Sequence, residues 1–141
     1  MMVQTVKDQK QIIEASIRRY LERAQKSFGC EFDFPTVDLD LQGSVAGRTW
    51  YHKKHLQFNS ELYSQNKRKF LKTTIPHEVS HLVAFKISPD KGKCHGKVWR
   101  SVMRELGAIP KRHHDYDVSK LKKVENEDYY DRETDFNPFK G

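Results

Sequence analysis

Two histidines and a glutamate stand at a spacing that suits metal-assisted hydrolysis, in the segment His77-Glu78-Val79-Ser80-His81. Residues four apart on a helix are separated by about 40° around its axis and by one turn along it, so both imidazoles face one point. Glu78 lies beside that point, where its carboxylate can take a proton from water that the metal activates. Zinc is the expected cofactor, because imidazole ligands with an open coordination position suit it.

A catalytic zinc site of this kind needs a third protein ligand, and two candidates follow the motif. Thirteen residues separate His81 from His95, and Cys94 directly precedes His95. His95 opens a predicted helix over 95–106, where Trp99 would pack that helix against the one that carries the motif. A free cysteine more often behaves as a small hydrophobic residue. We therefore expect His95 to be the third ligand, with Cys94 as the alternative.

The elements that must position these residues follow from hydrophobic spacing. Apolar residues recur at three- and four-residue intervals over 5–27, which predicts an amphipathic helix. Strict alternation over 37–41 is typical of a strand with one buried face, and two further short segments favour a three-stranded antiparallel meander over about 36–58. A helix over 77–86 carries the motif, with Pro76 in its first turn. The fold class expected is α+β.

The charge of the chain is positive and unevenly distributed. Its length of 141 residues is typical of a single domain. The net charge is +7 and the pI is near 9.4. Residues 1–124 contain 24 basic and 13 acidic side chains, whereas residues 125–141 contain 2 basic and 6 acidic ones. A basic body of this kind favours a polyanionic partner. The acidic segment is expected to be a poorly ordered tail.

Basic residues concentrate before the motif and around the third ligand, which predicts a phosphate-binding surface beside the active site. Single-stranded DNA is the favoured nucleic acid, with Trp50, Tyr51 or Trp99 as possible platforms on which bases stack. The alternative is an ordinary solvated cationic surface. The candidate contacts are Lys67, Arg68, Lys69, Lys93, Lys97, Arg100 and Arg104.

Several classes of protein are disfavoured. No apolar run approaches the length that spans a bilayer, and the first residues lack the apolar stretch of a secretory signal. Two cysteines are too few for a disulfide framework, which favours a reducing environment. We expect an intracellular protein without a membrane partner, cytoplasmic or, if DNA-bound, nuclear or nucleoid-associated.

Longer segments around the motif resemble a known family. They are PHEVSHL at 76–82, HGKVW at 95–99 and LGAIP at 106–110, preceded by GSVAGRTW at 43–50 and LQFN at 56–59. They are similar to the corresponding parts of the SprT-like metalloprotease domain, to which the DNA-dependent protease Spartan also belongs. The resemblance covers about residues 10–120.

This resemblance implies a zincin-like domain over 1–124, followed by the acidic tail. It implies zinc held by His77, His81 and His95, with Glu78 as the catalytic base. For the Spartan-like branch it implies cleavage of proteins crosslinked to DNA. Many SprT-like proteins add a Cys-rich zinc ribbon that binds nucleic acid, which the two cysteines of this sequence cannot supply.

The expected function is that of a zinc metalloendopeptidase that acts on DNA-associated or DNA-crosslinked protein substrates. One alternative is a nucleic-acid-binding module whose zinc is structural or catalytically idle. Another is a regulatory peptidase that cuts a single repressor, as ImmA/IrrE-like proteins do, although the pattern His95-Gly96-x-x-Trp99 favours the SprT-like family over it.

Overall fold

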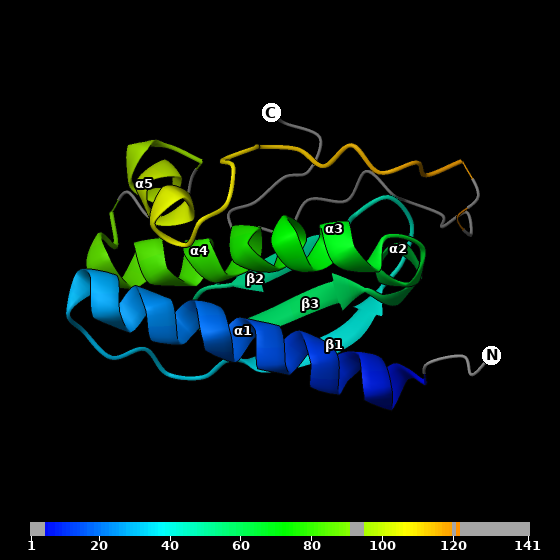
Figure 1. Ribbon diagram of the computed structural model, residues 1–141, viewed down its shortest axis with the longest axis horizontal. Coiled ribbons are helices and arrows are strands. Elements are labelled where there is room, and N and C mark those ends of the chain that lie inside the picture. Colours follow the sequence, from blue (N-terminus) through cyan, green and yellow to red (C-terminus); the bar gives the residue numbers. More distant parts are fainter. Residues whose placement is uncertain (1–4, 91–94, 120, 122–141) are drawn as a thin grey trace.

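The computed structural model describes residues 5–90, 95–119 and 121, so Lys93, Cys94 and the predicted tail at 125–141 lie outside the described residues. The fold is α+β (Figure 1). Its elements, in chain order, are α1 (Val6–Phe28), β1 (Thr36–Leu41), β2 (Gly47–Trp50), β3 (His55–Asn59), α2 (Ser60–Gln65), α3 (Lys67–Lys72), α4 (Thr74–Ile87) and α5 (Lys97–Glu105).

The first helix agrees with the sequence prediction to within one residue at each end. Thr5 and Asp8 cap each other's backbone N–H groups at its start, and Gly29 ends it in the left-handed conformation with φ of 67°. Its buried stripe includes Ile13, Ile17 and other apolar side chains that form part of the core. This stripe packs against α4 and β1, and α4 also packs on β2, so the two helices cover one face of the sheet (Figure 1).

The predicted antiparallel meander is wrong, because the sheet is mixed. The strand order is β1-β3-β2, with β1 parallel to β3 and β2 antiparallel to β3. After β1 the chain crosses to the far edge of the sheet, forms β2 there and returns through a hairpin into the centre. Alternation along one strand identifies its buried face but not its neighbour, so the sequence pattern could not distinguish the two arrangements.

A buried asparagine fixes this crossing. The side-chain amide of Asn59 donates to the carbonyls of Gly43 and Val45 at 2.9 and 3.0 Å. Its side-chain oxygen accepts from the backbone N–H of Leu62 at 3.0 Å and thereby caps α2. Because Asn59 is fully buried, each of these bonds satisfies a group that would otherwise be costly to bury. The loop that leads into β2 is therefore held against the end of β3.

The two helices predicted around the motif are present with shifted ends. α4 begins at Thr74, so Pro76 lies in its first turn as expected. α5 begins at Lys97, which leaves His95 in the connection that precedes it rather than on the helix. Residues 111–117, which follow α5, form neither helix nor strand.

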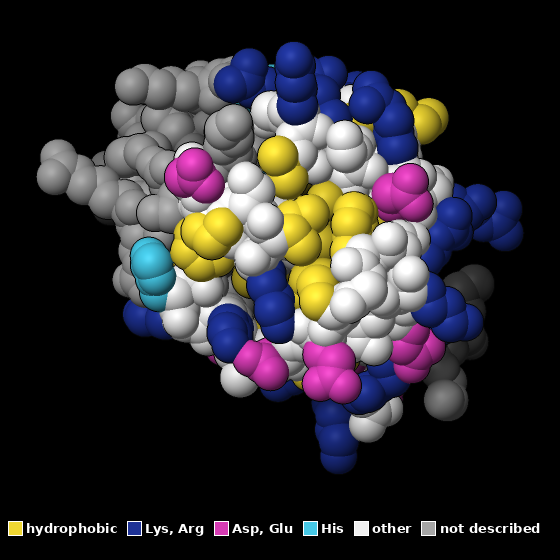
Figure 2. All heavy atoms as spheres, turned by 90° about the vertical axis from the view of Figure 1, so that its left-hand side faces the viewer, with side chains coloured by type: hydrophobic (Ala, Val, Ile, Leu, Met, Phe, Trp, Pro, Cys, Tyr) yellow, Lys and Arg dark blue, Asp and Glu magenta, His cyan; other side chains and the backbone are white. Residues whose placement is uncertain are grey.

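Hydrophobic side chains also reach the surface at the end of the molecule where α1 and α4 terminate. Figure 2 shows an apolar patch on this face, surrounded by charged side chains. Ile87 at the end of α4 is 39% exposed. Within the described residues, no helix has the length and apolar character needed to cross a membrane.

Candidate metal centre

Three histidines converge on one point between α4 and α5. Nε2 of His95 lies 3.1 Å from Nε2 of His77 and 3.1 Å from Nε2 of His81. One ligand atom from each residue lies within 4.8 Å of the other two. Tetrahedral zinc with Zn–N bonds of about 2.0–2.1 Å separates its nitrogen ligands by roughly 3.3 Å. The three side chains therefore fit a single metal ion, and His95 takes the place that the sequence prediction gave it.

The electrostatics of the cluster favour neutral imidazoles. Burial and, to a lesser extent, the neighbouring His95 together lower the pKa of His77 to about 3. Burial likewise lowers the pKa of His95 to about 4, with a contribution from the positive charge of Arg112. A neutral imidazole keeps the nitrogen lone pair that a metal requires. At neutral pH His77 and His95 can therefore accept a cation without first releasing protons.

Two buried aromatic residues orient the ligands. The indole N–H of Trp99 donates to the backbone carbonyl of His77 at 3.1 Å, and its ring stacks on His81 at an interplanar angle of 23°. The hydroxyl of Tyr51 lies 3.3 Å from Nδ1 of His81. Trp99 and Tyr51 are 0% and 1% exposed, so the proposal that bases stack on either of them is wrong. Trp50 is half-buried, so base stacking on Trp50 stays a prediction.

The carboxylate of Glu78 is fixed beside the cluster by strand β2. Its Oε1 accepts a hydrogen bond from the hydroxyl of Thr49 at 2.7 Å, and its Oε2 lies 3.7 Å from Nε2 of His77. A Cβ atom on Gly47 would lie 2.8 Å from Cγ of Glu78, so only glycine fits there. Burial raises the pKa of Glu78 to about 7, while the Thr49 hydrogen bond and the charge of Arg48 oppose this effect.

A cavity of about 860 Å³ opens directly onto His77 and Glu78. Its inner side is formed by α4 and by the loop that leads into β2. Its outer side is residues 109–118, which we call the outer wall. This segment follows α5 and runs alongside α4 and α3 (Figure 1). The cavity therefore lies between the outer wall and the candidate base.

The outer wall is tied down by contacts to three other parts of the chain. Asp115 pairs with Lys69 on α3 and with Lys111 at 2.8 Å. Nε2 of His114 donates to the carbonyl of Ser44 at 2.5 Å. The hydroxyl of Tyr116 lies 2.7 Å from the hydroxyl of Thr74 and 3.0 Å from that of Thr73. His114 and Tyr116 thus help to build the wall.

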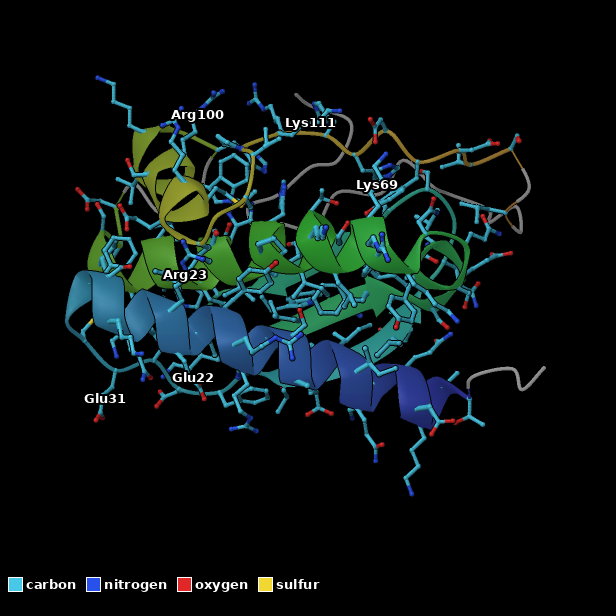
Figure 3. All side chains as sticks on the ribbon, in the orientation of Figure 1. Glu22, Arg23, Glu31, Lys69, Arg100 and Lys111 are labelled. Carbon is cyan, nitrogen blue, oxygen red and sulfur yellow. The ribbon has the colours of Figure 1, made fainter. Side chains whose placement is uncertain are left out.

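The predicted nucleic-acid contacts that the structure describes lie on the surface, and Lys69 also lines the cavity. Figure 3 shows Arg100, Lys111 and Lys69 along the edge of the molecule that carries α5 and the outer wall, whereas Glu22 and Glu31 lie on the opposite edge. Arg100 also donates from Nε to the carbonyl of His95 at 3.2 Å. The described predicted contacts are all exposed, namely Lys67, Arg68, Lys69, Lys97, Arg100 and Arg104.

Sequence reasoning missed the residues that hold the site from other elements. Gly47 and Thr49 on β2 meet Glu78 from about 30 residues away in sequence. Tyr51, directly after β2, meets His81 across a similar separation. No periodic pattern marks such residues. The segment GSVAGRTW at 43–50, which forms part of the family resemblance, is the local signal that could have drawn attention to β2.

Comparison with known proteins agrees with this geometry. The sequence profile of the SprT-like family matches residues 17–121. Protein SprT of Pseudomonas putida is 38% identical over 100 residues, which are 70% of this chain and 61% of that protein. Protein SprT of Pseudomonas entomophila is 34% identical over 111 residues, 78% of this chain and 68% of that protein. No solved structure matches the chain.

Three converging imidazoles on an α+β scaffold define a domain that can bind a metal ion. The profile match extends over most of the chain, so the chain belongs to the SprT-like family. It spans about three fifths of the length of the Pseudomonas putida relative.

Proposed function

We propose that the protein is a zinc-dependent metalloendopeptidase with a zincin-like site. The observation that carries the proposal is the meeting of three imidazoles, a buried carboxylate and an open cavity at one point. His77, His81 and His95 would hold the ion. When bound, zinc supplies Lewis-acid polarisation of a carbonyl group and lowers the pKa of a water molecule.

The protein's own residues account for the movement of the proton. Glu78 accepts a proton from the attacking water and then passes it to the amine that leaves when the peptide bond breaks. A base that is also to act as an acid works best with a pKa near the operating pH, and burial raises the pKa of Glu78 towards that range in the metal-free protein. The outer wall confines the substrate beside Glu78. Trp99 holds α5 against α4, the helix that carries His77 and His81.

We also propose that its substrates are proteins bound or crosslinked to DNA, inside the cell. The support is the positive net charge and the exposed cations near the cavity mouth. A single strand that crosses this edge would bring an attached protein to the cavity. Such binding should weaken steeply as salt rises, with a log–log slope of about −0.7 per phosphate contacted.

The decisive experiment compares wild type with Glu78→Gln, both loaded with zinc, on a denatured protein and on the same protein linked to single-stranded DNA. The glutamine variant should retain zinc and the fold but lose cleavage, because it cannot accept a proton. Faster cleavage of the linked substrate, abolished by salt, would support the DNA proposal. If the two proteins behave alike on every substrate, the protease proposal fails and a binding module with an idle metal takes its place.

A further inference from the structure

Strand β2 presents two inward-facing residues to the candidate base, one small and one polar. Gly47 and Thr49 are two apart in the strand, so they lie on the same face of the sheet, and both contact Glu78. All three residues are buried, with Thr49 1% and Glu78 3% exposed. In a buried site, a carboxylate keeps the orientation that its hydrogen bonds impose.

The two carboxylate oxygens of Glu78 have different surroundings. Oε1 takes the hydrogen bond from the Thr49 hydroxyl at 2.7 Å. Oε2 is the oxygen that lies 3.7 Å from Nε2 of His77, on the side of the imidazole cluster. The same hydroxyl lies 3.2 Å from the backbone carbonyl of Glu78, so Thr49 bridges the side chain and the main chain of one residue.

We propose that Thr49 is a positioning residue whose hydroxyl holds Oε1 of Glu78, so that Oε2 is the oxygen that exchanges protons in the reaction. Gly47 contributes by leaving the space that the Glu78 side chain fills. The role of Oε2 in the reaction rests on the proposed function, whereas the orientation of the carboxylate does not. Without the hydroxyl, the carboxylate plane of Glu78 is less restrained about its terminal torsion, so that an oxygen is directed at the cluster for less of the time.

The test measures the carboxylate directly as well as the reaction. The full chain is labelled with ¹³C at the glutamate carboxyl carbons and loaded with zinc, and the Glu78 signal is identified by its loss in Glu78→Gln. Thr49→Val should move this signal, whereas Thr49→Ser should leave it close to its original position. Thr36→Val, at an exposed site on β1, is the matched control and should not move it.

Cleavage supplies the second readout. Thr49→Val should lower kcat by about ten- to a hundredfold, the range expected for one hydrogen bond to a charged group, with KM and zinc content unchanged. Thr49→Ser should restore kcat, which a purely structural role of the methyl group would not allow. Thr49→Ala removes the same hydroxyl and replaces the valine variant if that variant does not fold.

The outcomes separate this inference from the proposed function. An unmoved Glu78 signal in the valine and alanine variants overturns the positioning role, whether or not the protein is a protease. A loss of activity that serine does not restore also overturns it. Absence of cleavage by wild type overturns the proposed function alone, because the carboxyl signal still reports whether Thr49 orients Glu78.

Discussion

The inner side of the candidate site, taken here as α4, β2 with the loop that leads into it, and α5, is largely buried, whereas the outer wall at 109–118 is exposed along most of its length. His81 and Trp99 on the inner side are fully buried. On the outer wall only Tyr116 is buried, and Ile109 is 81% exposed. Close packing fixes the atoms of the inner side, because a displaced buried group loses contacts and hydrogen bonds together.

Exposed ion pairs such as those of Asp115 hold their partners weakly, since water and salt compete for both charges. The comparison therefore separates a fixed centre, where chemistry requires accurate placement, from a wall that can yield to a substrate. Changes to the inner side should abolish metal binding or turnover, and changes to the outer wall should alter substrate binding.

The largest effect is expected from removal of the third ligand. His95→Ala should lower zinc affinity by at least about a hundredfold, because the ~10–16 kcal/mol of a protein zinc site is shared among few ligands. Elemental analysis after dialysis against a weak chelator measures the loss. Cys94→Ala is the matched control and should keep about one zinc per chain. The reverse order would contradict the assignment of His95.

A large effect on turnover is expected where β2 touches the base. Gly47→Ala places a Cβ atom 2.8 Å from Cγ of Glu78, so the carboxylate must move. Misplacement of a reacting group by about 1 Å can cost on the order of a hundredfold in rate. We expect kcat to fall by about that factor while zinc is retained. Unchanged kcat would show that the base tolerates displacement and would weaken the contrast between the two sides.

A smaller effect is expected from the loss of the Tyr51 hydroxyl, which lies beside the ring of His81. Tyr51→Phe removes the hydroxyl that lies 3.3 Å from Nδ1 of His81. Loss of such a partner typically costs about 10–100-fold in metal affinity, and a hydroxyl should lie at the lower end of that range. Competition with a chromophoric chelator measures the affinity. Tyr63→Phe, in the core away from the ligands, serves as the control.

The metal-free protein should lose stability as the pH falls below about 6.5. The pKa values of His77 and His95 are lowered to about 3 and 4, so the unfolded chain takes up protons before the folded one does, which favours unfolding. Glu78 acts in the opposite direction, because its raised pKa favours the folded state at low pH. The effect of the two histidines outweighs that of the one glutamate, so the free energy of unfolding increases with pH over this range.

Urea unfolding of the metal-free protein at pH 7.5 and 5.5 measures this dependence. Glu78→Gln removes the opposing group and should make the loss on acidification larger. A loss of the same size in both proteins would mean that Glu78 does not titrate in this range.

The smallest effect on stability is expected at the outer wall. Asp115→Asn weakens the pairing with Lys69 and Lys111, both at the surface, and should change Tm very little. If the wall yields to substrate, KM should change while kcat and zinc content stay the same. Asp117→Asn, two residues further along, is the control. A fall in kcat without a change in KM would place the wall in the reacting centre.

Much of the centre follows from the sequence because its parts are local. His77 and His81 share a helix face by their spacing alone, and Glu78 must then lie beside them. The stripe of α1 and the stop at Gly29 are likewise properties of a continuous stretch of chain. His95 was predicted as the third ligand from its residue type and from the helix expected to begin at it, and the structure places its imidazole beside those of His77 and His81.

Tertiary structure alone decided the strand order and the contacts that depend on it. The pattern of β1 was compatible with a parallel or an antiparallel neighbour, and only the fold placed β2 at the edge beside α4. The contacts of Gly47 and Thr49 with Glu78 follow from that placement. The sequence thus determined which residues can bind a metal and move a proton, because helical spacing is set within a few residues. The packing of distant segments determined how the base is oriented and how the cavity is walled, because hydrogen bonds and steric fit between them exist only once the chain has folded.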